Sequence, residues 1–253
     1  MVQFRIQGFR NEEAFSDITN LIEKAIEYRF PSEWTDTLRI IQEPKVLRFD
    51  ISKSSSEFSN IQQEFKKTMP TAIIKRVERI QSKTIWRNFI LDQEMLKEKY
   101  GPSMPVLPTV MVYHGTSSTN PDEIIKGEEG FDMRYSADGY WGRAVYFAVN
   151  SSYSHAYSYK NKSSSFSTLE YGDRQMFYAK VNIGLFHDAG QQINREIKTP
   201  PPIDQYTIQQ KGIPHGDQKL LYDSIKGNTQ GSDVYMVYAN RKAYPSYLIT
   251  YTS

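Results

Sequence analysis

The sequence VMVYHGT, residues 110–116, places a polar His114 and a Gly115 directly after an apolar run. The apolar, β-branched character of the run predicts a strand that ends near His114. A glycine at the exit of a strand lets a ligand approach the backbone closely. Downstream, YWGRAVYFAVNSSYSHAY, residues 140–157, predicts a glycine-containing bend, a second apolar strand and a short helix. We therefore take these two stretches as the centre of the fold and of a candidate site.

The predicted short helix carries hydroxyl and aromatic side chains at intervals of three residues. Ser151, Ser154 and Tyr157 can therefore lie on one helical face. Such a face suits a planar ring that bears an amide. Each feature alone has an ordinary explanation, since a histidine at a strand end is usually a capped core residue and a Ser- and Tyr-rich helix is usually a solvated face. Only their ordered combination points to a function.

Apolar periodicity predicts further strands and helices before and after these two stretches. Further predicted strands cover 2–6, 47–51, 72–80, 176–183, 234–238 and 247–251, and predicted helices cover 11–26, 55–65 and 84–99. We expect 160–175 and 188–220 to be long surface excursions. Many short strands with few helices indicate an α+β fold. We expect two units, a strand–helix appendage at 1–29 and a main domain at 30–253.

Composition excludes several classes of protein. The chain has 253 residues, 31 Lys and Arg against 29 Asp and Glu, and no cysteine. A net charge of +2 argues against a polyanion binder that works through bulk charge. Without cysteine there is no disulfide, no thiolate nucleophile and no cysteine-based metal site. We expect no membrane span and no secretory signal, and therefore a cytoplasmic or nuclear protein.

Common catalytic patterns are absent from the sequence. It contains no GxxxxGK[ST], no GxGxxG after a strand, no HExxH and no GxSxG. Four scattered histidines without cysteine do not suggest a zinc site, so we expect no metal. The usual signatures of P-loop, dinucleotide-dehydrogenase, zinc-peptidase and serine-hydrolase enzymes are therefore missing.

An ordered series of motifs resembles the catalytic domain of the poly(ADP-ribose) polymerase family, the diphtheria-toxin-like ADP-ribosyltransferases. The series consists of EFSNIQQEFKKTM, IIKRVERIQSKTIW, YHGT, the YWG to YFA segment, SSYS, YDS and AYPSYLITY. It runs from about residue 30 to residue 251, and its wording is most similar to mono-transferring members that carry macro domains upstream. The resemblance implies an ADP-ribosyltransferase fold of two packed, mainly antiparallel β-sheets with flanking helices. It also implies NAD as co-substrate.

The resemblance implies a role for each matching residue. His114 matches the histidine of a His-Tyr-Glu triad and is expected to bind a ribose hydroxyl on the adenosine side. Gly115 is expected to hold the nicotinamide amide through its backbone, and Thr116 to lie beside the donor. Tyr146 matches the triad tyrosine on the nicotinamide side.

Three further residues complete the predicted donor site. Ser154 is expected to donate to the nicotinamide carboxamide oxygen, and Tyr157 to stack on the nicotinamide ring. Arg134, in the loop over the donor, is expected to reach the adenosine or the pyrophosphate.

The third triad position is occupied by Val234, where polymer-forming members have the glutamate of E-Y-x-V-Y. Valine cannot hydrogen-bond a ribose or polarise an incoming hydroxyl. The neighbouring Asp233 faces the other side of the strand, because successive strand residues alternate. A slip of one residue would bring Asp233 in but turn Val237 and Tyr238 the wrong way. The resemblance therefore implies a mono-ADP-ribosyltransferase.

Alternatives remain open at this stage. The family's Gly-Lys-Gly is Gly142-Arg143-Ala144 here, and alanine restricts the backbone, so the donor loop is expected to shift. The first function is transfer to a protein side chain, the protein itself included. The second is an inactive scaffold that binds NAD or ADP-ribose. The third is transfer to nucleic-acid ends, for which basic charge is available at Lys66, Lys67, Lys75, Arg76 and Arg79. Retention of His114 favours the first.

Overall fold

The computed structural model describes residues 30–35, 46–103, 108–160 and 171–253. The predicted strand at 2–6, the helix at 11–26 and the boundary after residue 29 lie outside these residues. The main strands are β1 (Leu47–Asp50), β2 (Ile73–Gln81), β3 (Thr109–His114), β6 (Val145–Ala148), β7 (Tyr159–Lys160), β8 (Arg174–Asn182), β9 (Phe186–Gly190), β10 (Ser224–Thr229), β11 (Ser232–Val237) and β12 (Ala243–Thr252). A hairpin is formed by β4 (Asp138–Gly139) and β5 (Gly142–Arg143), and the helices are α3 (Ser56–Lys66), α4 (Lys83–Tyr100), α5 (Pro121–Lys126), α6 (Ser151–His155) and α7 (Gln205–Lys211).

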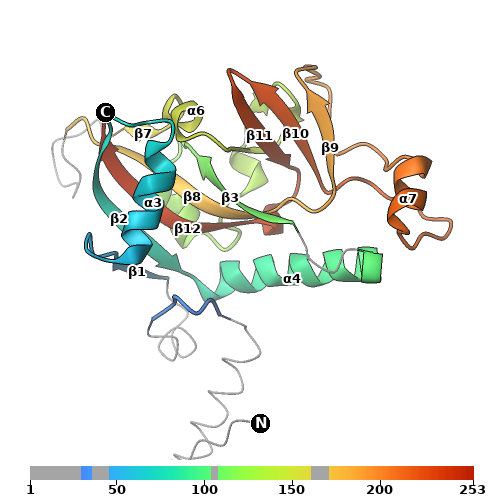
Figure 1. Ribbon diagram of the computed structural model, residues 1–253, viewed down its shortest axis with the longest axis horizontal. Coiled ribbons are helices and arrows are strands. Elements are labelled where there is room, and N and C mark those ends of the chain that lie inside the picture. Colours follow the sequence, from blue (N-terminus) through green and yellow to red (C-terminus); the bar gives the residue numbers. More distant parts are fainter. Residues whose placement is uncertain (1–29, 36–45, 104–107, 161–170) are drawn as a thin grey trace, which may run out of the picture.

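The strands form a large, mostly antiparallel sheet in the order β1-β2-β12-β8-β3-β6-β11-β10-β9, and the β4–β5 hairpin forms a small second sheet. The large sheet nearly divides between β3 and β6, which share the single Cα pair Tyr113 and Ala148. Figure 1 shows the result as two groups of strands, with β9, β10 and β11 standing apart from β2, β12, β8 and β3. The predicted α+β fold is confirmed, and its two predicted sheets are joined at this one point.

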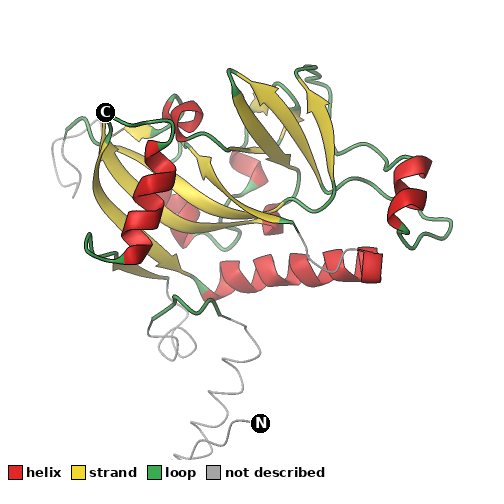
Figure 2. Cartoon of the chain, in the orientation of Figure 1, coloured by secondary structure: helices red, strands yellow, loops and turns green. Residues whose placement is uncertain are grey.

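Alternating side chains of the central strands supply both faces of the core. In β12, Tyr247 and Ile249 pack on the side of α3, whereas Leu248 packs in the cluster that contains Ile124 and Ile125 of α5. Burial of each large apolar side chain contributes about 1.5–3 kcal/mol. The sheet is therefore covered on opposite faces by α3 and α5, and Figure 2 shows the helices lying around a body made of strands.

The two longer helices begin where the sequence predicts. Ser55 caps α3 by accepting a hydrogen bond from the Phe58 backbone N–H, and Ser82 caps α4 by accepting from the Ile85 N–H. Trp86 of α4 packs edge-on against Tyr244 of β12, with ring centroids 5.2 Å apart. None of the described helices is long and apolar enough to cross a bilayer.

The region 188–220 is mostly exposed, as expected of a surface excursion, but it contains regular structure. It begins inside β9, which pairs with β10 in parallel, and it contains α7. Asp204 caps this helix by accepting from the Thr207 N–H, and Gly212 ends it in the left-handed conformation. Ile208 packs in a cluster with Leu96 of α4. Helix α7 has few apolar residues, so the sequence shows too little helical periodicity to predict it.

Candidate active site

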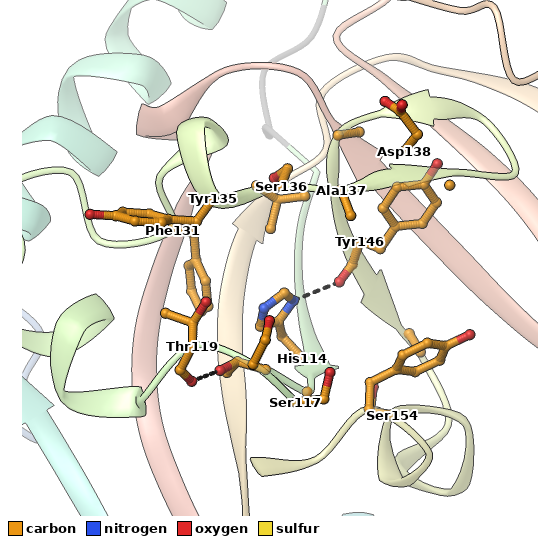
Figure 3. Close-up of a pocket in the computed structure, with 18 of the residues that line it drawn as sticks. His114, Ser117, Thr119, Phe131, Tyr135, Ser136, Ala137, Asp138, Tyr146 and Ser154 are labelled. Carbon is orange, nitrogen blue, oxygen red and sulfur yellow. Dashed lines mark hydrogen bonds between the residues drawn. The ribbon is translucent and has the colours of Figure 1, made fainter.

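A cavity of about 380 Å³ lies where the two groups of strands meet. Its wall comes from the end of β3, from β6, from the β4–β5 hairpin and from α6. Figure 3 shows His114 near the middle, with Thr119 and Tyr135 on one side and Tyr146 and Ser154 on the other. The two sequence stretches that were predicted to form a site therefore share one cavity.

His114 ends β3 and is held in one orientation. Its Nδ1 lies 2.8 Å from the backbone carbonyl oxygen of Tyr146, so this nitrogen carries the proton and donates. The ring lies against Phe131 and Phe147, with centroids 5.0 and 5.2 Å away. Burial lowers the pKa of His114 to about 4, although the bond to the Tyr146 carbonyl opposes this shift. The imidazole is therefore neutral near pH 7, with Nε2 as an acceptor.

Tyr146 joins the β6 strand to the hairpin above it. Its hydroxyl donates to the Gly142 carbonyl oxygen at 2.7 Å and accepts from the Trp141 N–H at 2.9 Å. A Cβ on Gly139 would come within 2.5 Å of that hydroxyl, so the hairpin can lie this close only with glycine there. Burial raises the pKa of Tyr146 to about 12. The phenol is therefore neutral and positions the hairpin over the cavity.

Gly115 is required by the protein's own packing. A Cβ at this position would lie 2.5 Å from the Ser154 carbonyl oxygen and 2.6 Å from the Tyr157 carbonyl oxygen. A side chain at residue 115 would therefore displace α6, besides obstructing a ligand that approaches the backbone. Thr116 is buried beside it and donates its hydroxyl to the Thr119 carbonyl oxygen within the same loop.

The serine hydroxyls of helix α6 lie in two different environments. Ser154 and Tyr157 line the cavity, as predicted. Ser151 does not: it is buried and donates to the Phe65 carbonyl oxygen at 2.6 Å, which attaches α6 to α3. The prediction that Ser151 shares the ligand-facing side is therefore wrong. Tyr153 lines the cavity instead, 5.6 Å from the Tyr157 ring.

Val234 is fully buried in β11 and is not part of the cavity wall. It packs in a cluster with Ala144, Ala148 and Tyr146, which do line the cavity. The side chain thus lies behind the wall and not among the residues that line the cavity. Asp233 accepts from Asn228 at 2.7 Å on the other face, so no carboxylate from β11 reaches the cavity.

Arg134 does not lie where the resemblance implies. Its side chain is 79% exposed, and its Nε lies 2.8 and 3.0 Å from the two carboxylate oxygens of Asp132. It borders a smaller neighbouring cavity formed with the residues after α5, and it is absent from the wall of the main one. The predicted contact of Arg134 with the donor is therefore not supported by its position.

The Gly142-Arg143-Ala144 departure does not distort the described backbone. Gln230 is the sole non-glycine residue of the described ranges with a positive φ, so Ala144 has an ordinary conformation. Ala144 is 3% exposed and packs in the cluster behind the cavity. Alanine at this position therefore needs no strained backbone in this fold.

Sequence reasoning missed several lining residues, among them Tyr140 and Arg195. The guanidinium carbon of Arg195 lies 5.0 Å from the centre of the Tyr140 ring. The segment after β9 is fixed to the hairpin, because Asn194 N–H donates to the Tyr140 carbonyl oxygen at 3.0 Å and Trp141 Nε1 donates to the Gln192 carbonyl oxygen at 2.8 Å. This segment has no periodicity that could have signalled its position.

The chain matches a protein-family model and several known proteins. The family model of the poly(ADP-ribose) polymerase catalytic domain matches residues 55–253. A probable poly(ADP-ribose) polymerase of Dictyostelium discoideum is 33% identical over 223 residues, which cover 88% of this chain and 57% of that protein. Human protein mono-ADP-ribosyltransferase PARP12 is 23% identical over 225 residues, 88% of this chain and 28% of that protein.

A mouse relative adds to these matches. Protein mono-ADP-ribosyltransferase PARP11 of Mus musculus is 28% identical over 215 residues, 79% of this chain and 59% of that protein. The chain spans less than two thirds of the length of each of these three relatives.

Proposed function

Because the chain belongs to the poly(ADP-ribose) polymerase catalytic-domain family, we propose that it is an NAD-dependent mono-ADP-ribosyltransferase that acts on a protein side chain. The observation that carries this proposal is the bond between His114 and the Tyr146 carbonyl in a cavity that also exposes Gly115 and Ser154. Two relatives that are themselves named mono-ADP-ribosyltransferases support the single-transfer activity.

Different residues of the cavity bind different parts of NAD. The backbone of Gly115 and the hydroxyl of Ser154 hold the nicotinamide amide, and the exposed ring of Tyr157 covers the nicotinamide face. His114 offers its Nε2 to a ribose hydroxyl, since its Nδ1 is occupied by the Tyr146 carbonyl. This grip fixes the ribose so that an acceptor attacks C1′ as nicotinamide leaves through an oxocarbenium-like transition state.

Transfer of a single unit follows from what β11 supplies. A growing polymer needs a carboxylate that polarises the hydroxyl of the next sugar. Val234 is apolar and lies behind the wall, and Asp233 is engaged by Asn228 on the opposite face. The protein therefore attaches one ADP-ribose and lacks the group that would extend it.

Incubation with labelled NAD tests the proposal. We expect a discrete labelled protein band and release of nicotinamide, and we expect His114→Ala to abolish both. A ladder of polymer would refute single transfer. Binding of NAD without nicotinamide release would instead identify a scaffold.

Transfer to nucleic-acid ends receives little support from the surface charges. Lys75, Arg76 and Arg79 form ion pairs with Asp173, Glu78 and Glu57 at 2.7, 2.6 and 2.8 Å. Lys67 likewise pairs with Glu64 at 2.7 Å. A phosphate backbone would have to replace these carboxylates, so we place this acceptor second.

A further inference from the structure

Arg195 is the one Lys or Arg side chain among the described residues that line the cavity. It comes from the segment between β9 and α7, which lies outside the motifs that carried the sequence resemblance. Its guanidinium lies 5.0 Å from the Tyr140 ring centre, a distance typical of a cation–π contact. That contact restrains the side chain at the cavity and leaves its N–H groups available for a ligand.

The backbone around Arg195 is fixed by the hairpin that covers the cavity. The preceding Asn194 donates its N–H to Tyr140, and Trp141 donates its indole N–H to Gln192. Ile197, two residues further, contacts Gly142 so closely that only glycine fits there. A cation on an anchored segment needs little reordering to meet a ligand, which favours a binding role.

Two other titratable side chains of the cavity, His114 and Asp132, add no net charge to it. His114 is neutral, because its burial lowers the pKa to about 4. Asp132 is neutralised by Arg134, whose guanidinium contacts both of its oxygens. Asp138 lines the cavity as well, but Figure 3 shows it beyond Tyr146 from His114 and Ser154. Arg195 forms no ion pair within the part of the chain that the structure describes, so its charge is available to the proposed ligand, a dinucleotide with two negative phosphates.

We propose that Arg195 binds the diphosphate of NAD and thereby takes the part that the sequence suggested for Arg134. This inference rests on the proposed function, since it assumes NAD as the ligand. A planar guanidinium fits two phosphate oxygens at once, so the contact positions the donor as well as attracting it. Arg195 is thus a donor-binding residue on a segment with no recognisable motif.

Calorimetry with fragments of the donor tests the proposal without requiring turnover. We expect Arg195→Gln to weaken ADP-ribose binding about tenfold, the effect of one charge-assisted contact at an exposed position. Binding of nicotinamide should stay within about twofold of the parent, because this fragment has no phosphate. Arg195→Lys should recover part of the lost affinity, since it restores the positive charge but not the planar guanidinium that binds two oxygens at once. Lys198→Gln, an exposed cation on the same segment, should bind ADP-ribose like the parent.

Ionic strength supplies a second measurement on the same variants. Salt should weaken ADP-ribose binding to the parent more than to Arg195→Gln, because the variant has lost the screened charge. Equal affinity of the parent and Arg195→Gln for ADP-ribose would overturn the proposal, as would an equal loss for nicotinamide. Reduced transfer with unchanged ADP-ribose affinity would also overturn it, by assigning Arg195 to the acceptor.

The proposed enzyme activity can fail separately. A parent protein that binds ADP-ribose through Arg195 but transfers nothing from NAD would refute the activity and leave this assignment standing. A parent that binds neither NAD nor ADP-ribose would refute both.

Discussion

The α-carbon of Gly142 faces the backbone carbonyl of Ile197 so closely that a Cβ atom on residue 142 would overlap that oxygen. Gly142 also has a φ of +75°, a conformation that other residues rarely adopt. This contact brings the hairpin above the cavity together with the segment that carries Arg195. The shape of the cavity mouth therefore depends on Gly142.

Replacement of Gly142 by alanine should separate these two segments. The left-handed backbone alone costs about 1–2 kcal/mol for a residue with a side chain, and the overlap with Ile197 adds to it. We expect a loss of about 2 kcal/mol or more in the free energy of unfolding, measured by urea denaturation, together with weaker binding of NAD. Gly216→Ala is the matched control, because a Cβ there meets nothing within 4 Å and the backbone is not left-handed. Equal stability of the two variants would contradict the argument.

The titration of His114 should make stability depend on pH. Its pKa is lowered to about 4 by burial, from an ordinary value of 6.5, so the folded state favours the neutral ring. Its contribution is fully present above pH 6.5 and is lost as the pH falls towards 4, because protons then bind the unfolded state more tightly. The integrated effect is about 3 kcal/mol.

The comparison that isolates this effect uses His114→Gln. The free energy of unfolding, measured between pH 7 and pH 4, should fall more steeply for the parent than for the variant. The decline that both proteins share belongs to other groups, among them His155, whose pKa is also lowered by burial. Parallel curves would show that His114 keeps an ordinary pKa.

Introduction of a glutamate at position 234 should not create a polymerase. The Val234 side chain is fully buried between β6 and β10, where it pairs with Ala148 and Gly227. A carboxylate at this position would lose its hydration without gaining a partner, so we expect Val234→Glu to destabilise the protein by about 3 kcal/mol or more. Val234→Leu, which is larger but apolar, measures the part due to volume.

The length of the ADP-ribose product tests whether Val234→Glu acts as a polymerase. Folded Val234→Glu, incubated with labelled NAD at low temperature, should still give a discrete band because residue 234 lies behind the wall. A ladder of polymer from this variant would show that the side chain reaches the donor.

Local pattern was sufficient to predict the elements that build the site. The apolar strand before His114 and the strand around Tyr146 have the predicted positions, and Gly115, Ser154 and Tyr157 meet in one cavity as the resemblance implied. These residues follow their strands and helix directly, so correct elements were enough to place them.

Residues fixed by contacts distant in sequence could not be predicted in the same way. Arg195 reaches the cavity through hydrogen bonds between two loops, which no periodicity encodes. Arg134 lies outside the cavity wall because Asp132, two residues away, binds its guanidinium there. Ser151 was misplaced because spacing by three residues does not say which part of a short helix meets Phe65 of a neighbouring helix.

The three serines of α6 provide the sharpest separation of binding from folding. The Ser154 hydroxyl lines the cavity and has no hydrogen-bond partner in the part of the chain that the structure describes. We therefore expect Ser154→Ala to raise the KM for NAD about tenfold, the effect of one hydrogen bond, with little change in the free energy of unfolding. Ser151→Ala should do the opposite and lower that free energy by about 1–2 kcal/mol, because it leaves the buried Phe65 carbonyl oxygen without its donor. Ser152→Ala, on the exposed side of the same helix, should change neither quantity. If Ser154→Ala and Ser151→Ala both unfold more easily and bind NAD equally well, α6 serves folding alone and the proposed grip on nicotinamide is lost.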